Sequence, residues 1–148
     1  MGLFQSFDIS ASGMTAQRLR MDTISENIAN INTTRTAEGT PYTRKVVTFS
    51  EKLINPSFSE TLEEYMHKYK GNGVRVSRIY EDEDTEYVME YDPSHPDADE
   101  NGYVTYPNVN TVTEMTNLID SSRAYQANVT AFNSAKTIAT SGISIGQG

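Results

Sequence analysis

Apolar side chains recur at helical spacing near both ends of the chain, and they alternate with polar side chains in its middle. The N-terminal pattern covers about residues 3–31, and its main apolar positions lie seven residues apart: Phe7, Met14, Met21 and Ile28. The C-terminal pattern follows Pro107 and uses steps of three and four residues: Met115, Leu118, Tyr125, Val129 and Phe132. This spacing predicts two long amphipathic helices, each roughly 40 Å long at about 1.5 Å per residue. Asn110 or Thr111 is expected to cap the second helix.

The middle of the chain favours β-structure. Three stretches carry the β-branched and aromatic residues typical of strands: "YTRKVVTF", "GVRVSRIY" and "EYVMEY". Between the first two, Ser57 and Glu60 have the spacing of a capping box, which predicts a short helix near residues 57–70. We therefore predict an α+β fold, in which long N- and C-terminal helices form a coiled coil around a small β-rich central domain. The expected division is residues 1–34, 35–106 and 107–148.

The predicted coiled-coil seam is thin. Polar side chains interrupt it at Ser10, Gln17, Ser122 and Lys136, and small residues flank both helices. Small side chains allow helices to approach closely on more than one side, which favours packing among many copies of the chain. A plain helical hairpin that carries a β insertion remains the alternative from the pattern alone.

The stretch "HPDADENGYV" at residues 95–104 resembles the start of a calcium-binding loop. A loop of that kind needs a bidentate Glu at its twelfth position, and the twelfth residue from Asp97 is Asn108. We therefore predict an acidic turn, whose Asp and Asn side chains bond their own backbone and whose Gly102 has positive φ. A calcium-dependent binding module centred on Asp97, Asp99 and Asn101 is the alternative.

Charge and composition narrow the functional classes. The formal net charge is −8, and residues 81–100 hold ten acidic side chains without a Lys or Arg. This balance argues against binding to nucleic acid or to anionic lipid. The absence of cysteine excludes thiol catalysis, thiolate metal sites and disulfides. No segment has the length and apolarity of a membrane span, and we expect export without a cleaved signal peptide.

The remaining candidates for chemistry are weak. His67 and His95 lack metal-ligand spacing, and we expect both to face solvent. The acidic run "EDEDTE" at residues 81–86 is expected to be a solvated loop, since catalytic carboxylate pairs need burial or opposed environments. A secreted hydrolase that uses this run is the remote alternative. We expect no enzyme, no catalytic residue, no cofactor, no metal ion and no small-molecule substrate.

Both ends of the chain resemble one protein family. "SGMTAQRLRMDTISENIANINTT" at residues 12–34 is similar to the N-terminal signature of the bacterial flagellar rod and hook proteins. "VTEMTNLIDSSRAYQANVTAFNSAKTI" resembles their C-terminal signature, while "GTPYTRKVVTF" and "YDPSHPDADENGYVTYPNVN" resemble the branch that forms the proximal rod. Residues 51–72 depart from that branch, since they look longer and more helical.

The resemblance implies a structural subunit of the proximal rod of the flagellar basal body, in the periplasmic space. Such a subunit is exported by the flagellar type III apparatus, assembles through its terminal helices and transmits motor torque to the distal rod and hook. Its implied partners are other copies of the chain, other rod subunits, and the export gate and membrane-ring components at the rod base. Neither nucleic acid nor direct membrane insertion is expected.

Two sets of residues are the predicted assembly sites. The first is the seam, in which the four N-terminal positions would pack against the C-terminal ones: Phe7, Met14, Met21, Ile28, Met115, Leu118, Tyr125, Val129 and Phe132. The second lies where the first helix ends, at Asn27, Asn30 and Asn32. Their side chains are expected to bond exposed carbonyls there or in a neighbouring subunit. A simple helix stop by Asn in the left-handed conformation is the alternative.

Overall fold

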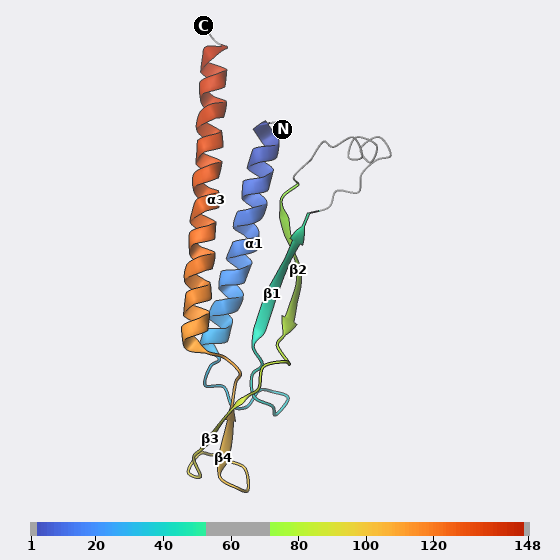
Figure 1. The fold of residues 1–148 in the computed structure, drawn as a ribbon, viewed down its shortest axis with the longest axis vertical. Coiled ribbons are helices and arrows are strands. Elements are labelled where there is room, and N and C mark those ends of the chain that lie inside the picture. The colour runs from blue at the N-terminus through green and yellow to red at the C-terminus, as the bar shows by residue number, and fades with distance from the viewer. Residues whose placement is uncertain (1–2, 53–71, 147–148) are drawn as a thin grey trace, which may run out of the picture. The chain divides into compact units, whose positions relative to one another are not determined.

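The computed structural model describes residues 3–52 and 72–146, and its elements are two long helices with four short strands (Figure 1). Their order is α1 (Leu3–Ala29), β1 (Lys45–Glu51), β2 (Val74–Glu81), β3 (Val88–Tyr91), β4 (Tyr103–Tyr106) and α3 (Thr111–Ile145). The predicted α+β class, with helices flanking a small β region, is confirmed. The short helix predicted near residues 57–70 and His67 lie outside the described residues, as does most of the departure at 51–72.

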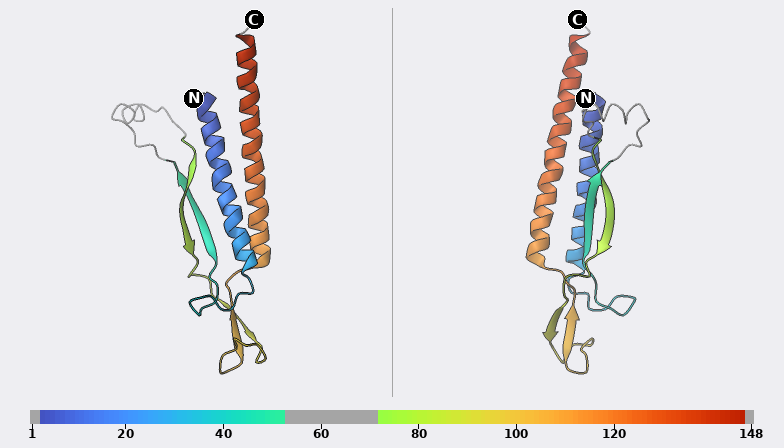
Figure 2. Two further views of the ribbon diagram at one scale, coloured as in Figure 1. Left: turned by 180° about the vertical axis from the view of Figure 1, so that it is seen from behind. Right: turned by 45° about the vertical axis from the view of Figure 1, so that its right-hand side comes forward.

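The strands form two separate two-stranded sheets, β1–β2 and β3–β4 (Figure 2). In the first, Asp82 N donates to Arg44 O at 2.8 Å, and Lys52 N donates to Gly73 O at 2.9 Å. These bonds join the start of one strand to the end of the other, so the pair is antiparallel. The second sheet is an antiparallel hairpin whose register pairs Val88 with Tyr106 and Tyr91 with Tyr103.

The chain divides into two compact units, which we name by their residues. The first unit comprises Met1–Arg18, Phe49–Ser77 and Ser122–Gly148; the second comprises Leu19–Thr48 and Arg78–Ser121. Each unit therefore contains part of α1, part of α3 and part of the β region. In the described part of the chain, no helix combines the length and the apolarity needed to cross a bilayer.

Small side chains determine how the first unit packs. Gly13 on α1 lies so close to α3 that an added Cβ would sit 2.6 Å from Asn128 Oδ1. On another side of α1, the Ser12 hydroxyl accepts a bond from Val74 N at 3.1 Å and donates one to Ile9 O at 2.7 Å. Gly73, at φ +88°, allows this approach, because a Cβ there would meet Ser12 Oγ. The Ser12–Gly13 pair thus lets two segments reach α1.

The second unit contains the most deeply buried apolar side chain, Val104, which is 0% exposed on β4. Ile24, Tyr42 and Val109 are also buried there. The start of α3 has the predicted cap, since Asn110 Oδ1 accepts a bond from Thr113 N at 3.1 Å. The cap and the preceding chain place the first turn of α3 within this unit.

We predict that Gly13→Ala and Asn128→Ala are energetically coupled. Alanine alone at position 13 should lower the free energy of unfolding by about 1 kcal/mol, because the overpacking cost of about 1–3 kcal/mol exceeds the gain in helix propensity of about 1 kcal/mol. In the Asn128→Ala background the same change should stabilise the chain, since the obstructing amide is gone. Urea unfolding followed by circular dichroism measures the free energy of unfolding of the native chain, both single variants and the double variant. Equal effects of Gly13→Ala in both backgrounds would contradict the close approach.

Candidate functional site

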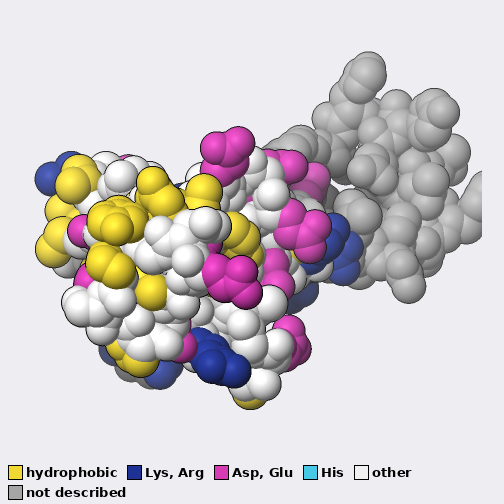
Figure 3. Space-filling model, turned by 90° about the horizontal axis from the view of Figure 1, so that it is seen from below, with side chains coloured by type: hydrophobic (Ala, Val, Ile, Leu, Met, Phe, Trp, Pro, Cys, Tyr) yellow, Lys and Arg dark blue, Asp and Glu magenta, His cyan; other side chains and the backbone are white. Residues whose placement is uncertain are grey.

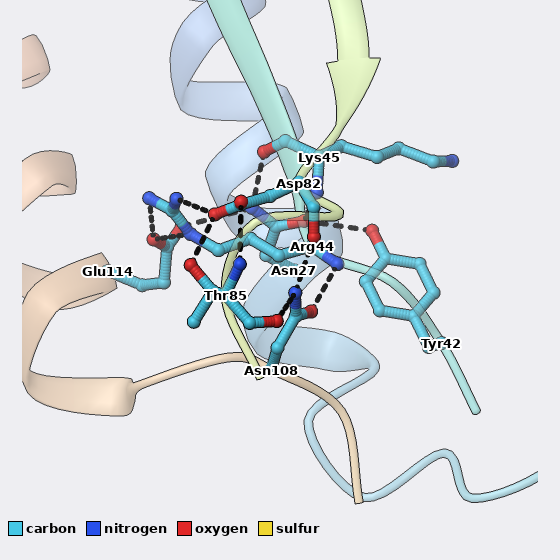
Figure 4. Close-up of polar contacts among 8 residues, drawn as sticks. All are labelled: Asn27, Tyr42, Arg44, Lys45, Asp82, Thr85, Asn108 and Glu114. Atoms are coloured by element: carbon cyan, nitrogen blue, oxygen red, sulfur yellow. Dashed lines mark hydrogen bonds and ion pairs between the residues drawn. The ribbon is translucent and has the colours of Figure 1, made fainter. Parts of the chain in front are cut away.

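A buried polar cluster lies in the second unit, where α1 ends and α3 begins (Figure 4). Its side chains come from the last turns of α1, the segment that enters β1, the loop after β2, and the start of α3. The cluster consists of Asn27, Tyr42, Arg44, Lys45, Asp82, Thr85, Asn108 and Glu114. The sequence separations within it reach 87 residues, so only the folded unit brings these groups together.

Asn27 uses its whole amide inside the cluster. Its Oδ1 accepts bonds from Lys45 N at 2.9 Å and from Tyr42 OH at 2.9 Å. Its Nδ2 donates to Lys45 O at 2.8 Å and to Glu114 Oε2 at 3.1 Å. An amide offers two acceptor positions and two donors, so this fully buried side chain is satisfied. By bonding both backbone groups of Lys45, Asn27 fixes the start of β1 to α1.

Glu114 is the centre of the charged part of the cluster. Its side chain is 1% exposed, and its Oε1 accepts bonds from Arg44 Nη2 at 2.8 Å and Nε at 2.9 Å. The remaining guanidinium nitrogen of Arg44, Nη1, donates to Asp82 Oδ2 at 3.1 Å. Asp82 also accepts bonds from the hydroxyl and the backbone N–H of Thr85. One Arg therefore links two carboxylates that belong to different elements.

Asn108 closes the cluster on the side of the loop after β2. Its Oδ1 accepts a bond from Arg44 N at 2.8 Å, and its Nδ2 donates to Asp82 O at 2.6 Å and to Thr85 O at 3.1 Å. The Asn108 side chain thus satisfies the hydrogen bonding of backbone groups in two other segments, which would otherwise lack partners when buried.

The surroundings shift the pKa values of three members. Burial, together with the carboxylates of Glu26, Glu81 and Glu114, raises the pKa of Tyr42 to about 12. Burial acts to lower the pKa of Arg44, but its bonds to Glu114 and Asp82 outweigh burial and raise it. Burial acts to raise the pKa of Asp82, but bonds from Thr85 and Arg44 outweigh it and hold that pKa below its usual value. Arg44 and Asp82 therefore keep their charges at neutral pH.

This arrangement is suited to holding segments together rather than to chemistry. Both carboxylates are engaged by Arg44, and every polar atom of Asn27 has a partner, so these groups are committed to contacts within the chain. Among the residues that the structure describes, no group of three or more His, Cys, Asp or Glu side chains is placed to hold a metal ion.

The predicted seam residues lie on α1 and α3 as expected from their spacing. The structure brings two of them together in the first unit, since the rings of Phe7 and Phe132 have centroids 4.9 Å apart. Met115 is 55% exposed in the single chain. The others are half-buried: Met14, Met21, Ile28, Leu118, Tyr125 and Val129. The fully buried face of α1 instead carries Ser10, Gly13, Ala16, Thr23, Ile24 and Asn27.

The three asparagines at the end of α1 differ in their surroundings. Asn27 belongs to the polar cluster, and it bonds within the chain. Asn30 Nδ2 donates to Glu26 O at 2.9 Å, and its Oδ1 accepts a bond from Thr33 Oγ1 at 3.2 Å. The side chain of Asn30 therefore bonds a carbonyl in the last turn of α1. Asn32 is exposed in the turn that follows.

The predicted acidic turn is confirmed. Asp99 Oδ1 accepts bonds from the backbone N–H groups of Asn101 and Tyr103, both at 2.8 Å, and Gly102 has a φ of +84°. The N–H groups of Tyr103 and Asn101 hold the pKa of Asp99 below its usual value. Asp97 is engaged elsewhere, since it accepts a bond from Thr34 Oγ1 at 2.8 Å and lies 3.8 Å from Arg35.

The structure differs from two predictions about polar residues. The acidic run at residues 81–86 is exposed as expected except at Asp82, which points into the polar cluster because Arg44 and Thr85 bond it there. His95 was expected to face solvent, but it is half-buried. Its Nδ1 accepts a bond from Asp97 N, and its ring packs near Tyr106 with centroids 6.3 Å apart.

Sequence reasoning missed Arg44, Asp82, Asn108 and Glu114 as members of a site. Arg44 stood inside a strand pattern, and Glu114 looked like an ordinary acidic residue in the first turn of a helix. The available signal for Arg44, Asn108 and Glu114 was their position in the family-like stretches, whereas Asp82 lies outside all of them. No spacing rule connects residues so far apart along the chain.

We predict that Glu114→Gln lowers the free energy of unfolding by about 2–4 kcal/mol, because it leaves the half-buried Arg44 with one carboxylate instead of two. Glutamine keeps the volume but has only one acceptor oxygen, so the loss reports the charge together with the bonds that the second carboxylate oxygen accepted. The matched control, Glu86→Gln, removes an exposed carboxylate and should stay within about 0.5 kcal/mol. Urea unfolding measures both, and equal effects would show that Glu114 is not specially engaged.

We predict that Tyr42 ionises with a pKa of about 12. The folded chain holds this proton more tightly than the unfolded chain, whose tyrosine pKa is about 10. The contribution of the Tyr42 proton to the free energy of unfolding is therefore complete below pH 10 and is lost as the pH rises toward 12. Carbon-13 NMR of labelled tyrosine Cζ atoms measures the pKa of Tyr42, and the Tyr42→Phe variant identifies its signal. Titration of that signal at about pH 10 would contradict the burial of the hydroxyl.

Comparison with known proteins identifies the family. A family model described as "Flagella basal body rod protein" matches residues 7–35, and one described as "Flagellar basal body rod FlgEFG protein C-terminal" matches residues 100–145. The chain is 45% identical over 153 residues to the flagellar basal-body rod protein FlgC of Borreliella burgdorferi, with all of both chains covered. It is also 45% identical over 153 residues to FlgC of Bacillus subtilis, covering 99% of this chain and all of the relative.

A more distant relative shows the same full-length match. FlgC of Salmonella typhimurium is 33% identical over 147 residues, with 99% of this chain and all of the relative covered. The two family models match regions that include Asn27, Asn108 and Glu114, so both matched regions meet in the polar cluster. The chain belongs to the FlgC family of flagellar basal-body rod proteins.

Proposed function

We propose that this chain is a structural, non-enzymatic subunit of the proximal rod, which assembles through α1 and α3. The observation that supports this most directly is the exposure of α3. Of its 35 residues only Glu114 and Ser121 are buried in the single chain. At about 1.5 Å per residue the helix is about 52 Å long, and a helix of that length gains most of its stability by burying one face.

The apolar side chains of α3 supply surface for such burial. Six of them are more than half exposed, and their spacing places them on more than one side of the helix: Val112, Met115, Ile119, Ile138, Ile143 and Ile145. Exposed apolar side chains in this number on one helix mark a protein contact rather than a solvated surface. In the proposed rod these side chains pack on other copies of the chain and on other rod subunits. The seam from Phe7 to Phe132 continues into those contacts as a coiled coil.

The proposal also assigns the subunit a position in the basal body and a route of export. The subunit occupies the periplasmic part of the basal body and meets the export gate and membrane-ring components at the rod base. It travels through the flagellar type III apparatus. Long helices packed together resist twisting, so the assembled rod passes motor torque to the distal rod and hook. The engaged carboxylates of the polar cluster support a structural role over a catalytic one.

We predict that Val129→Asp and Ile138→Asp abolish rod assembly and motility and leave export of the chain intact. A charge at either position prevents burial of the α3 face in a neighbouring subunit. Ile138 is 66% exposed, so its substitution should leave the helix content of the single chain unchanged. Asn133→Asp, which adds the same charge at an exposed polar position of α3, is the control and should preserve motility.

The assay uses cells that lack the native chain and express each variant. Swimming in soft agar, electron microscopy of basal bodies and immunoblots of exported protein provide the three readouts. Normal swimming of both Asp variants would exclude the α3 face from assembly. Loss of swimming in the Asn133→Asp control as well would show that added charge, not the apolar face, is responsible.

A further inference from the structure

The β3–β4 hairpin presents an apolar face that the assembly of the helices does not use. The register pairs Met89 with Thr105 and Tyr91 with Tyr103, so these four side chains share one face of the hairpin. Met89 is 70% exposed, Tyr91 63% and Tyr103 46%. The opposite face carries the fully buried Val104. We call Met89, Tyr91 and Tyr103 the hairpin patch.

The hairpin patch is rigidly formed rather than a set of loose side chains. The rings of Tyr91 and Tyr103 meet edge to face, with centroids 5.3 Å apart. Tyr91 also lies against Gly102, where an added Cβ would be 2.9 Å from its ring. Gly102 has positive φ in the turn that Asp99 closes. Preformed aromatic side chains lose little conformational entropy on binding, which favours their use as anchors.

The chain segment that carries Met89 and Tyr91 is acidic. Residues 81–100 hold ten Asp and Glu and no Lys or Arg; Asp92, Asp99 and Glu100 lie in the turn between Tyr91 and Tyr103, whereas Glu90 lies on the opposite face of the hairpin with Val104. Figure 3 shows hydrophobic side chains gathered beside acidic ones on the face viewed there. The partner surface must therefore supply positive charge around an apolar centre, since like charges at a contact are repelled.

The chain itself carries an excess of positive charge in its first unit. The described residues of that unit hold five basic and two acidic side chains, whereas those of the second unit hold five basic and fifteen acidic ones. Arg123 and Lys136 are exposed on the part of α3 that belongs to the first unit. The exposed Ile138 and Ile143 accompany them on this helix. Opposite charge and exposed apolar side chains thus occur together on the same chain.

We propose that the hairpin patch of one copy docks on the basic first unit of a second copy, on the α3 segment that carries Arg123 and Lys136. The contact joins different surfaces of identical chains, which generates rings or helical arrays rather than closed pairs. It rests on the proposed function, because it assigns one of the contacts by which rod subunits assemble.

The hairpin patch is small, so the proposed contact can form only together with other contacts between the two chains. Three side chains of about 150–250 Å² each, roughly 60% exposed, offer about 300–400 Å² of surface. A stable pair of proteins needs about 800 Å² on each partner. The hairpin patch alone is too small to hold two chains together in solution. It therefore sets which neighbours meet once the helices supply the remaining area.

The test uses a photo-activated benzoylphenylalanine in place of Met89 in the full chain, expressed beside the native chain in motile cells. After irradiation of isolated basal bodies, we expect an adduct of twice the 16.5 kDa chain mass. Its linked peptide should come from residues 122–146. The same probe at Glu38, an exposed loop position of the second unit outside the hairpin, is the control and should give several-fold less of this adduct.

A second measurement needs no variant. Zero-length carbodiimide crosslinking joins carboxylates to lysines, and residues 81–100 contain no lysine. Dimer-mass products from native basal bodies should therefore link peptides of residues 81–100 to Lys136. If the probe at Met89 prevents the variant chain from entering the basal body, this crosslink decides whether the hairpin docks on a second copy.

The outcomes separate this proposal from the proposed function. Absence of the chain from isolated basal bodies would refute both. Its presence there, with Met89 adducts only to a different rod subunit or with equal dimer adducts from Met89 and Glu38, would overturn the second-copy contact alone. A dimer adduct linked to residues outside 122–146 would overturn the assigned docking segment.

Discussion

The burial of one charge, the Glu114 carboxylate, governs the arrangement of the second unit. A carboxylate that is 1% exposed is stable only if its lone pairs are met by donors, and here Arg44 and Asn27 provide all of them. These two donors must therefore stay where they are. Arg44 in turn holds Asp82, and Asn27 holds the backbone of Lys45. One buried charge thus fixes the start of α3, the end of α1 and the entry to β1 relative to one another.

A cluster of this kind contributes specificity more than stability. The desolvation of two ions roughly offsets their attraction, so an apolar cluster of equal volume could be as stable. The polar cluster differs from an apolar cluster in the free-energy cost of a misplaced helix. Any shift of α3 along α1 would leave Glu114 without Arg44 and Asn27, at a cost of several kcal/mol. An apolar seam interrupted by Ser10 and Gln17 has no comparable penalty for sliding.

The local features of the fold could be predicted from the sequence, because each depends on neighbours in the chain. Helical spacing predicted α1 and α3, side-chain capping predicted the role of Asn110, and Asp–Asn–Gly chemistry predicted the turn at Gly102. The polar cluster could not be predicted this way. Asn27 and Glu114 lie 87 residues apart, and no periodic pattern relates them. Asp82 was misjudged because an acidic run looks solvated unless its partner Arg44 is known.

The buried face of α1 shows a second limit of pattern reading. Hydrophobic spacing selected the line of Phe7, Met14 and Met21, which is half-buried, whereas Gly13 and Ala16 are fully buried. Close approach to Asn128 explains the difference, because only a residue without Cβ fits at position 13 unless the Asn128 side chain moves. Small residues thus bring backbones together inside the chain, while larger apolar side chains remain partly exposed. In the rod proposed above, polar and small residues define the shape of one chain, and apolar side chains bind the next. Burying those apolar side chains within the chain would strengthen the single subunit and remove the surface that the proposed assembly requires.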